Sequence, residues 1–243
     1  MNSDFNQIRR GVRASEWQRI HAIIRDSILD VTLPPGSSIS ELDIAKQCGT
    51  SRTPVREALL RLADEGLVEI LPQRGTYVTQ MELSRLAEAI FVRQALESAV
   101  LHRLALLPDR TKLVSELADT IFEQERAMHA GNIAETLRAD ESFHRQLFDY
   151  AGMPGIWPLI LQVRDLHHRV RAIAVPELGS AKNAIIDHRS ILAALRQGNG
   201  DAAERAMRKH LGRNLDLAKE VARLYPEYFT QPTTPGSFKW RVG

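Results

Sequence analysis

The chain has one cysteine, Cys48, among its 243 residues, so it cannot form an intrachain disulfide. A single thiol fits a reducing cytoplasm, and we interpret Cys48 as a small buried apolar residue rather than a redox switch. No apolar run approaches the roughly 20 residues that span a bilayer, and the N-terminus lacks the apolar core of a signal peptide. We therefore expect a soluble, cytoplasmic protein with no membrane partner.

The chain also has little net charge, only +2, so bulk charge does not indicate nucleic-acid binding. Any such binding has to come from local patches. Residues 46–61 form one, with Lys46, Arg52, Arg56 and Arg61 against Glu57 alone. The length and the 44% hydrophobic content are enough for two domains, each with its own core.

The most informative segment is 51–78, which reads SRTPVREALLRLADEGLVEILPQRGTYV. Ser51 can cap a helix through its hydroxyl, and Pro54 supplies a fixed φ in the first turn. After this helix, Leu67–Leu71 and Thr76–Thr79 are typical of two short strands joined by a tight turn. The order of helix, strand, turn and strand predicts a winged helix-turn-helix.

Two further helices are predicted before this segment. Apolar residues at helical spacing place the first over Trp17–Leu29. The second is short and follows Ser40, its expected cap, with buried positions that include Leu42, Ala45 and Cys48. A tight turn then lets this helix brace the Ser51 helix in a DNA major groove.

These residues resemble the DNA-binding domain of the GntR superfamily of bacterial transcription regulators over Trp17–Val78, and SRTPVREAL is a specific string. The resemblance implies DNA contacts from Ser51, Arg52, Thr53 and Arg56, and from Arg74 and Gly75 in the wing. Some relatives have an arginine after the glutamate at the position of Glu41, where this chain has Leu42. Arg52 and Arg56 alone could form a solvated helix face, but the cap, turn and wing in register favour DNA binding.

From Glu82 onward the strand signals disappear and helical periodicity takes over. Six helices are expected, near Leu83–Leu107, Arg110–Ala130, Ile133–Tyr150, Gly155–Ala174, Ala181–Gln197 and Asp201–Leu224. We predict a mainly α protein in which the winged helix-turn-helix precedes an all-α antiparallel helical bundle. The predicted parts are an N-terminal tail at 1–14, the DNA-binding domain at 15–80, an effector-binding and dimerisation domain at 81–224, and a C-terminal tail at 225–243.

Polar residues stand on bundle stripes that should be apolar. Asp140 and His144 lie one turn apart on the inner stripe of the third bundle helix, and His188 and His210 take inner positions on the fifth and sixth. A buried carboxylate needs a partner, and one carboxylate with three imidazoles suits a divalent transition metal. Any one histidine could be a satisfied core residue, but four such residues together favour a metal site.

The same positions resemble the FCD domain of the FadR branch of the GntR superfamily over Leu83–Leu224. The matching strings are DESFHRQLF with Asp140 and His144, DHRSIL with His188, and RKHL with His210. Six helices that begin directly after the wing look closer to the VanR-like group than to the seven-helix group.

Arg93 lies on a stripe that faces the bundle interior, where its guanidinium could pair bidentately with a ligand carboxylate. The alternative is an ion pair with Glu97, one turn away. In the resembled family the equivalent arginine often lines the effector pocket, which favours effector binding by Arg93. Further candidates for pocket polarity on the fourth bundle helix are Arg164, His167, His168 and Arg171.

Together these observations predict a homodimeric transcription regulator of the FadR/VanR type that binds a two-fold symmetric operator in double-stranded DNA. The bundle is expected to hold a divalent metal, zinc or nickel, and a small carboxylate effector. Direct metal sensing is one alternative. A metal-dependent hydrolase is another, but no nucleophile or general-base motif accompanies the cluster, so we expect no enzyme.

Overall fold

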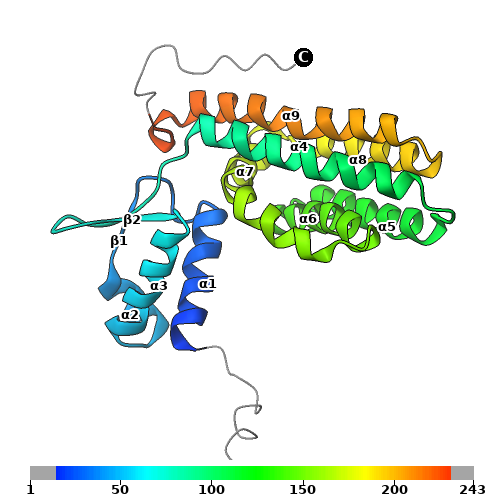
Figure 1. The fold of residues 1–243 in the computed structure, drawn as a ribbon. Helices are drawn as coiled ribbons and strands as arrows, with labels where there is room; N and C mark the ends of the chain where they lie inside the picture. Colours follow the sequence, from blue (N-terminus) through cyan, green and yellow to red (C-terminus); the bar gives the residue numbers. More distant parts are fainter. Residues whose placement is uncertain (1–14, 231–243) are drawn as a thin grey trace, which may run out of the picture. The chain divides into compact units, whose positions relative to one another are not determined.

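The computed structural model describes residues 15–230. The chain separates into two compact units that meet in the sequence between Gln80 and Met81 (Figure 1). The tail predicted at 1–14 lies outside the described residues, and so does the part of the predicted C-terminal tail at 231–243.

The first unit is a winged helix-turn-helix, as predicted. Its elements are α1 (Glu16–Leu29), β1 (Ser38–Ile39), α2 (Glu41–Cys48), α3 (Arg52–Asp64), β2 (Val68–Leu71) and β3 (Gly75–Val78). The strands form an antiparallel sheet in the order β1-β3-β2, with Val68 opposite Val78 and Leu71 opposite Gly75. Ile20 and Ile24 of α1 and Leu59 and Leu62 of α3 are buried in a shared core, which fixes α3 with its other face outward.

Two local predictions in this unit are wrong. Ser51 is the N-cap residue of α3, but within residues 15–230 its side chain makes no capping hydrogen bond, whereas the Ser40 hydroxyl accepts one from the Asp43 amide at 3.2 Å. Leu42 is 51% exposed, because the inner face of α2 is supplied by Ala45 with the partly buried Ile44. Cys48 is half-buried against the same core.

The second unit is an all-helical bundle, also as predicted. Its elements are α4 (Leu83–Ala105), α5 (Thr111–His129), α6 (Ile133–Tyr150), the 3₁₀ turn η1 (Pro154–Ile156), α7 (Trp157–Leu178), α8 (Ala181–Arg196), α9 (Gly200–Leu224) and the 3₁₀ turn η2 (Pro226–Tyr228). Helix α4 packs along α9, α5 packs along α6, and α8 lies beside both α5 and α9 (Figure 1). This arrangement directs the inner faces of α4, α6, α8 and α9 toward one interior.

Helix α7 is longer than the sequence predicted, because Pro176 does not end it. The helix continues to Leu178 with Pro176 inside its last turn. A proline there removes one hydrogen bond close to an end that is already losing partners. The helix stops at Gly179, whose φ of +59° is the left-handed conformation typical of a helix C-terminus.

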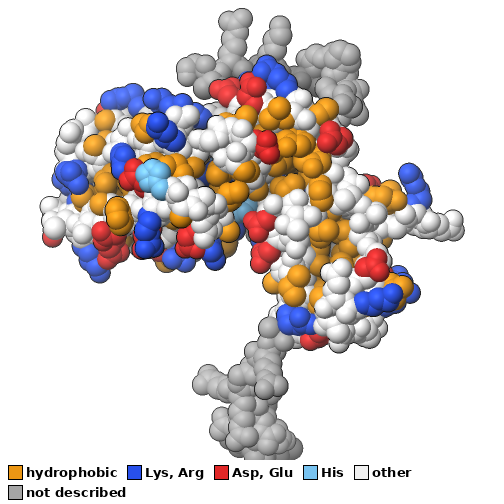
Figure 2. Space-filling view, turned by 180° about the vertical axis from the view of Figure 1, so that it is seen from behind, with side chains coloured by type: hydrophobic (Ala, Val, Ile, Leu, Met, Phe, Trp, Pro, Cys, Tyr) orange, Lys and Arg blue, Asp and Glu red, His pale blue; other side chains and the backbone are white. Residues whose placement is uncertain are grey.

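Charged side chains of both signs are mixed with hydrophobic ones over the face shown in Figure 2. This mixture agrees with the net charge of +2 and leaves DNA attraction to local groups. Across residues 15–230, none of the helices combines the length and the apolar content needed to cross a membrane.

Candidate metal centre and DNA-binding helix

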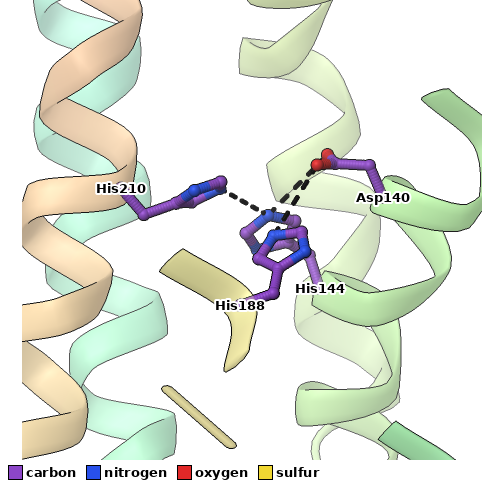
Figure 3. Close-up of side chains that lie close together, drawn as sticks. All are labelled: Asp140, His144, His188 and His210. Atoms are coloured by element: carbon purple, nitrogen blue, oxygen red, sulfur yellow. Dashed lines mark hydrogen bonds and ion pairs between the residues drawn. The ribbon is translucent and has the colours of Figure 1, made fainter. Parts of the chain in front are cut away.

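Four buried side chains from three helices converge in the interior of the bundle (Figure 3). Asp140 and His144 come from α6, His188 from α8 and His210 from α9, and one potential ligand atom of each lies within 4.8 Å of those of the others. His144 Nε2 is 3.2 Å from His210 Nε2, and His188 Nε2 is 3.6 Å from an Asp140 carboxylate oxygen. The structure therefore brings together all four residues that the sequence singled out as metal ligands.

Local structure explains the convergence. Asp140 and His144 are four residues apart, so one helical turn places them on the same face of α6. Helices α8 and α9 are joined by a short turn at Gly198 and pack along each other, which brings His188 and His210 together, with ring centroids 4.6 Å apart and planes tilted by 49°.

Each of the three histidines presents its Nδ1 atom to an acceptor on another helix. His144 Nδ1 donates to Glu97 Oε2 at 2.6 Å. His188 Nδ1 lies 2.9 Å from Gln124 Oε1, and His210 Nδ1 lies 3.9 Å from Asp187 Oδ2. A proton held on Nδ1 leaves the Nε2 lone pair available, which is how histidine ligands are oriented around a metal.

The geometry fits a divalent metal. His188 Nε2 is buried and has no hydrogen-bond partner within the described part of the chain, an expensive arrangement for a purely structural histidine. Metal–ligand bonds of about 2.0–2.2 Å put neighbouring ligand atoms roughly 3–4 Å apart, close to the separations found here. Three imidazoles and one carboxylate suit zinc, nickel and similar ions.

Burial and charge keep these groups in the protonation states that metal binding requires. Burial lowers the pKa of His188 well below its usual value and also lowers that of His210, so both rings are neutral near pH 7. Burial alone would raise the pKa of Asp140, but the charge and hydrogen bond of Arg171, with the neighbouring imidazoles of His188 and His144, bring it well below its usual value. The pKa of Glu97 falls to about 2, because Arg93 and His144 outweigh its burial.

Arg93 is 4% exposed and is already engaged by protein groups. Its Nε donates to Glu97 Oε1 at 2.7 Å, and its Nη1 donates to His167 Nδ1 at 2.7 Å. The ion pair considered as the alternative for Arg93 is therefore present. The cavity beside Arg93 and His144 has a volume of about 20 Å³, enough for about one water molecule.

A larger cavity borders the cluster at His210. Its volume is about 200 Å³, and its lining includes Arg171, Ser180, His210, Arg213 and Asn214. Arg171 is buried and pairs with Asp140 through Nη1, yet its Nη2 finds no hydrogen-bond acceptor among residues 15–230. An unpaired buried guanidinium N–H, on a residue that borders a cavity, is a candidate partner for an anionic oxygen.

The sequence had named Arg171 only as a candidate for pocket polarity, and it had missed Gln124 and Asp187. For these two residues the only available signal was a polar side chain on an inner helix stripe. Of the other candidates on α7, Arg164 pairs with Glu141 and His167 is buried against Arg93.

The predicted DNA-contacting side chains lie on the outside of the first unit. Ser51, Thr53 and Arg56 are exposed at the start of α3, and Arg52, 68% exposed, donates from Nη2 to Glu41 Oε2 of α2 at 2.8 Å. In the wing, Arg74 and Gly75 are exposed, and the Tyr77 hydroxyl donates to the Arg74 carbonyl at 2.9 Å. Gly75 has a φ of +108°, which a side chain would disfavour.

Comparisons with known proteins agree with both units. The family described as bacterial regulatory proteins, gntR family, matches residues 17–78, and the FCD domain matches residues 88–213. The HTH-type transcriptional repressor RspR of Escherichia coli K12 is 29% identical over 88% of this chain and 93% of its own length. An HTH-type transcriptional regulator of Streptomyces ambofaciens is 33% identical over 86% of this chain and 88% of its own.

A solved structure shares the fold. Escherichia coli McbR/YncC superposes with a TM-score of 0.70 at 20% identity, over 85% of this chain and 98% of that one. A winged helix-turn-helix joined to a helical sensing domain defines a DNA-binding transcription regulator rather than an enzyme. The chain belongs to the GntR family of transcription regulators and carries an FCD domain as its second unit.

Proposed function

We propose that this regulator binds operator DNA as a homodimer and that a small carboxylate, bound beside a divalent metal in the FCD domain, modulates that binding. The observation that carries the proposal is the cluster of Asp140, His144, His188 and His210, which is buried and has its Nε2 atoms turned inward. Each half of a two-fold operator would receive one α3, which requires two copies of the chain.

On DNA, the exposed end of α3 would enter the major groove. Arg52 and Arg56 would contact base edges or phosphates there, with Ser51 and Thr53 beside the backbone. Arg74 and Gly75 would place the tip of the wing against a phosphate or in the minor groove.

In the bundle, charge balance supports an anionic effector. The buried pairs Arg93–Glu97 and Arg171–Asp140 contribute two positive and two negative charges and cancel. A divalent ion among neutral imidazoles would leave two positive charges uncompensated in a low-dielectric interior. A carboxylate entering beside it would compensate one of these charges, and the ion could offer that acid an open coordination position.

The two cavities support one position for this carboxylate. The cavity lined by Arg171 and His210 has about ten times the volume of the cavity lined by Arg93, which Arg171 also borders, and Arg171 has an N–H to donate. We propose that the acid occupies the larger cavity with a carboxylate on Arg171. Arg93, predicted as the effector contact, would support the site through Glu97 and His167, and its direct contact with the acid stays a prediction.

The size and lining of this cavity also limit the acid. A volume of about 200 Å³ is below the roughly 300–1,000 Å³ of pockets for drug-sized ligands, so a small acid fits and a long acyl chain does not. Ser180, Asn183 and Asn214 place hydroxyl and amide groups around it. A small hydroxylated acid would use these groups, which is the class we propose.

Two measurements test the proposal. Metal analysis of purified protein should find close to one divalent ion per chain. A thermal-shift panel of zinc-loaded protein with hydroxy acids, sugar acids, dicarboxylates and fatty acids should single out small hydroxylated acids. A hit present at a hundred times its Kd should add about 2.7 kcal/mol of stability. Protein that takes up no metal at neutral pH, or that responds only to fatty acids, would contradict the proposal.

A further inference from the structure

The segment after α9 turns back and pairs with the residue at which the second unit begins. The Met81 amide donates to the Tyr228 carbonyl at 2.8 Å, and the Thr230 amide donates to the Met81 carbonyl at 2.9 Å. Met81 and Phe229 thereby form an isolated parallel bridge. Both main-chain polar groups of Met81 are therefore bonded to residues about 150 positions further along the chain.

Side-chain packing reinforces these hydrogen bonds. Met81 is fully buried and Phe229 is 6% exposed. Tyr225 and Tyr228 stack with ring centroids 5.1 Å apart and planes within 6°, and η2 packs on α9. In Figure 1 the end of α9 lies beside the start of α4, where this pairing occurs. We call residues 225–230 the C-terminal clasp.

The clasp lies between two functional parts of the chain. Only Thr79 and Gln80 separate Met81 from Val78, the last residue of the wing strand β3. At its other end the clasp continues from α9, the helix that carries His210. Leu224 lies fourteen positions after His210, about 21 Å along the helix. A shift of α9 at the metal cluster would therefore be carried to the point from which the DNA-binding unit leaves the bundle.

We propose that the C-terminal clasp couples the metal and effector site to DNA binding by holding Met81 to the end of α9. This inference rests on the proposed function, since it requires that occupancy of the site alters operator affinity. The two states are a closed clasp, which fixes Met81, and an open clasp, which frees it. A contact made of two main-chain hydrogen bonds and one buried ring is small enough to open without unfolding the bundle. Ligands at His210 would bias that equilibrium through α9.

Thr230 provides a matched pair of variants in the full chain. Thr230→Pro removes the amide that donates to Met81, while Thr230→Ala retains it and loses only the hydroxyl, which lies 3.4 Å from the Met81 carbonyl. The backbone of Phe229 is extended, with φ −115° and ψ 144°, so a proline after it meets no steric conflict there. Phe229→Ala deletes the buried ring and serves as a second test if Thr230→Pro does not fold.

The experiment measures operator Kd by fluorescence anisotropy for metal-stripped protein, for zinc-loaded protein, and for zinc-loaded protein with tartrate, gluconate or citrate. The wild type should change its operator Kd at least about fivefold between the extreme conditions, the lower end of ordinary allosteric coupling. In Thr230→Pro and Phe229→Ala the ratio of the operator Kd values under the two extreme conditions should lie within about twofold of one. Zinc content should stay near one per chain in both variants, and Thr230→Ala should keep the wild-type ratio.

Two outcomes overturn the inference, and they can be told apart. If the operator Kd of the wild type does not change with zinc or with any of the acids, the proposed function is contradicted, and the proposed role of the clasp with it. A wild type that responds, together with a folded Thr230→Pro or Phe229→Ala that responds equally, contradicts the clasp alone. If the clasp only stabilises the fold, the variants should have a lower melting temperature and keep the wild-type Kd ratio.

Discussion

Arg52 of α3 donates a hydrogen bond from Nη2 to Glu41 Oε2 of α2 at 2.8 Å. An arginine expected to face DNA is thus oriented by a carboxylate from the helix that braces it. Glu41 is only about a quarter exposed, so the pair forms at the junction of the two helices. An oriented guanidinium is better suited to bidentate recognition of a guanine than a free one.

We predict that Arg52→Ala and Arg56→Ala each weaken operator binding while the bundle stays folded. If a phosphate contact is lost, the slope of log K against log salt should flatten by about one unit. Glu41→Gln should instead relax discrimination between operator and random DNA by up to about 1–3 kcal/mol, because Arg52 loses its orientation. Salt titrations by anisotropy on both DNAs measure these effects. Unchanged operator affinity in both arginine variants would contradict the assignment of α3 to the DNA interface.

The metal cluster gives the second prediction. His188→Ala or His210→Ala should lower zinc occupancy and the melting temperature, because metal binding stabilises only the folded chain. His129→Ala, which changes an exposed histidine of α5, is the control and should leave both quantities unchanged. Plasma emission spectrometry and calorimetry give the two readouts. Full zinc occupancy in both cluster variants would contradict the assignment.

The third prediction concerns Glu97, which accepts from His144 Nδ1 at 2.6 Å and from Arg93 Nε at 2.7 Å. Glu97→Gln preserves the size of the side chain and removes its charge, so His144 loses the carboxylate that orients it. Loss of such an outer partner commonly weakens metal affinity by about 10–100-fold. Competition with a chromophoric chelator measures the zinc Kd. A Kd within twofold of the wild type would show that Glu97 does not support His144.

The fourth prediction is the pH dependence of the metal-free protein. The pKa values of His188 and His210 lie below 6.5 in the folded chain, so the unfolded chain binds more protons below that pH. Their contribution to stability is therefore present above about pH 6.5 and is lost as the pH falls. The lowered pKa values of Asp140 and Glu97 act in the same direction below about pH 4.5.

Urea unfolding of chelator-treated protein between pH 7 and pH 5 tests the direction of this pH dependence. The free energy of unfolding should fall with acid, and His188→Gln should flatten the dependence, because that ring no longer gains a proton on unfolding. Stability that rises toward pH 5 in the wild type would contradict the prediction.

The fifth prediction separates the two buried arginines. If the acid binds Arg171, Arg171→Ala should cost its binding about 2–5 kcal/mol, and Arg93→Ala should mainly destabilise the bundle by removing the charged partner of the buried Glu97. If Arg93 is the contact, the larger loss of affinity moves to Arg93→Ala. Titration calorimetry on folded, zinc-loaded variants decides, and operator binding without the acid should persist in both. If Arg171→Ala binds the acid with wild-type affinity, Arg171 is not the contact for its carboxylate.

The sequence alone was sufficient to predict the winged helix-turn-helix and the helical bundle. Their signals are local: apolar periodicity, Ser40 before α2, and breakers between the helices all act within a few residues. Asp140 and His144 were identifiable for the same reason, since one helical turn places them on an inner face. Local rules failed where tertiary packing overrides them. Leu42 is exposed although α2 is amphipathic, and Pro176 lies inside α7 because a helix end tolerates one missing hydrogen bond.

Only the tertiary structure decided which groups complete the site. Glu97 reaches His144 across 47 residues and Gln124 reaches His188 across 64, so these pairs depend on which helices become neighbours. The sequence placed Arg93 on an inner stripe and named Arg171 only as a candidate for pocket polarity, but both are buried. They differ because Glu97 and His167 accept hydrogen bonds from Nε and Nη1 of the first, whereas Nη2 of the second has no acceptor among the described residues and the second borders the larger cavity. The pairing of Met81 with Thr230 has no local signal at all, because it forms only once α9 has packed along α4.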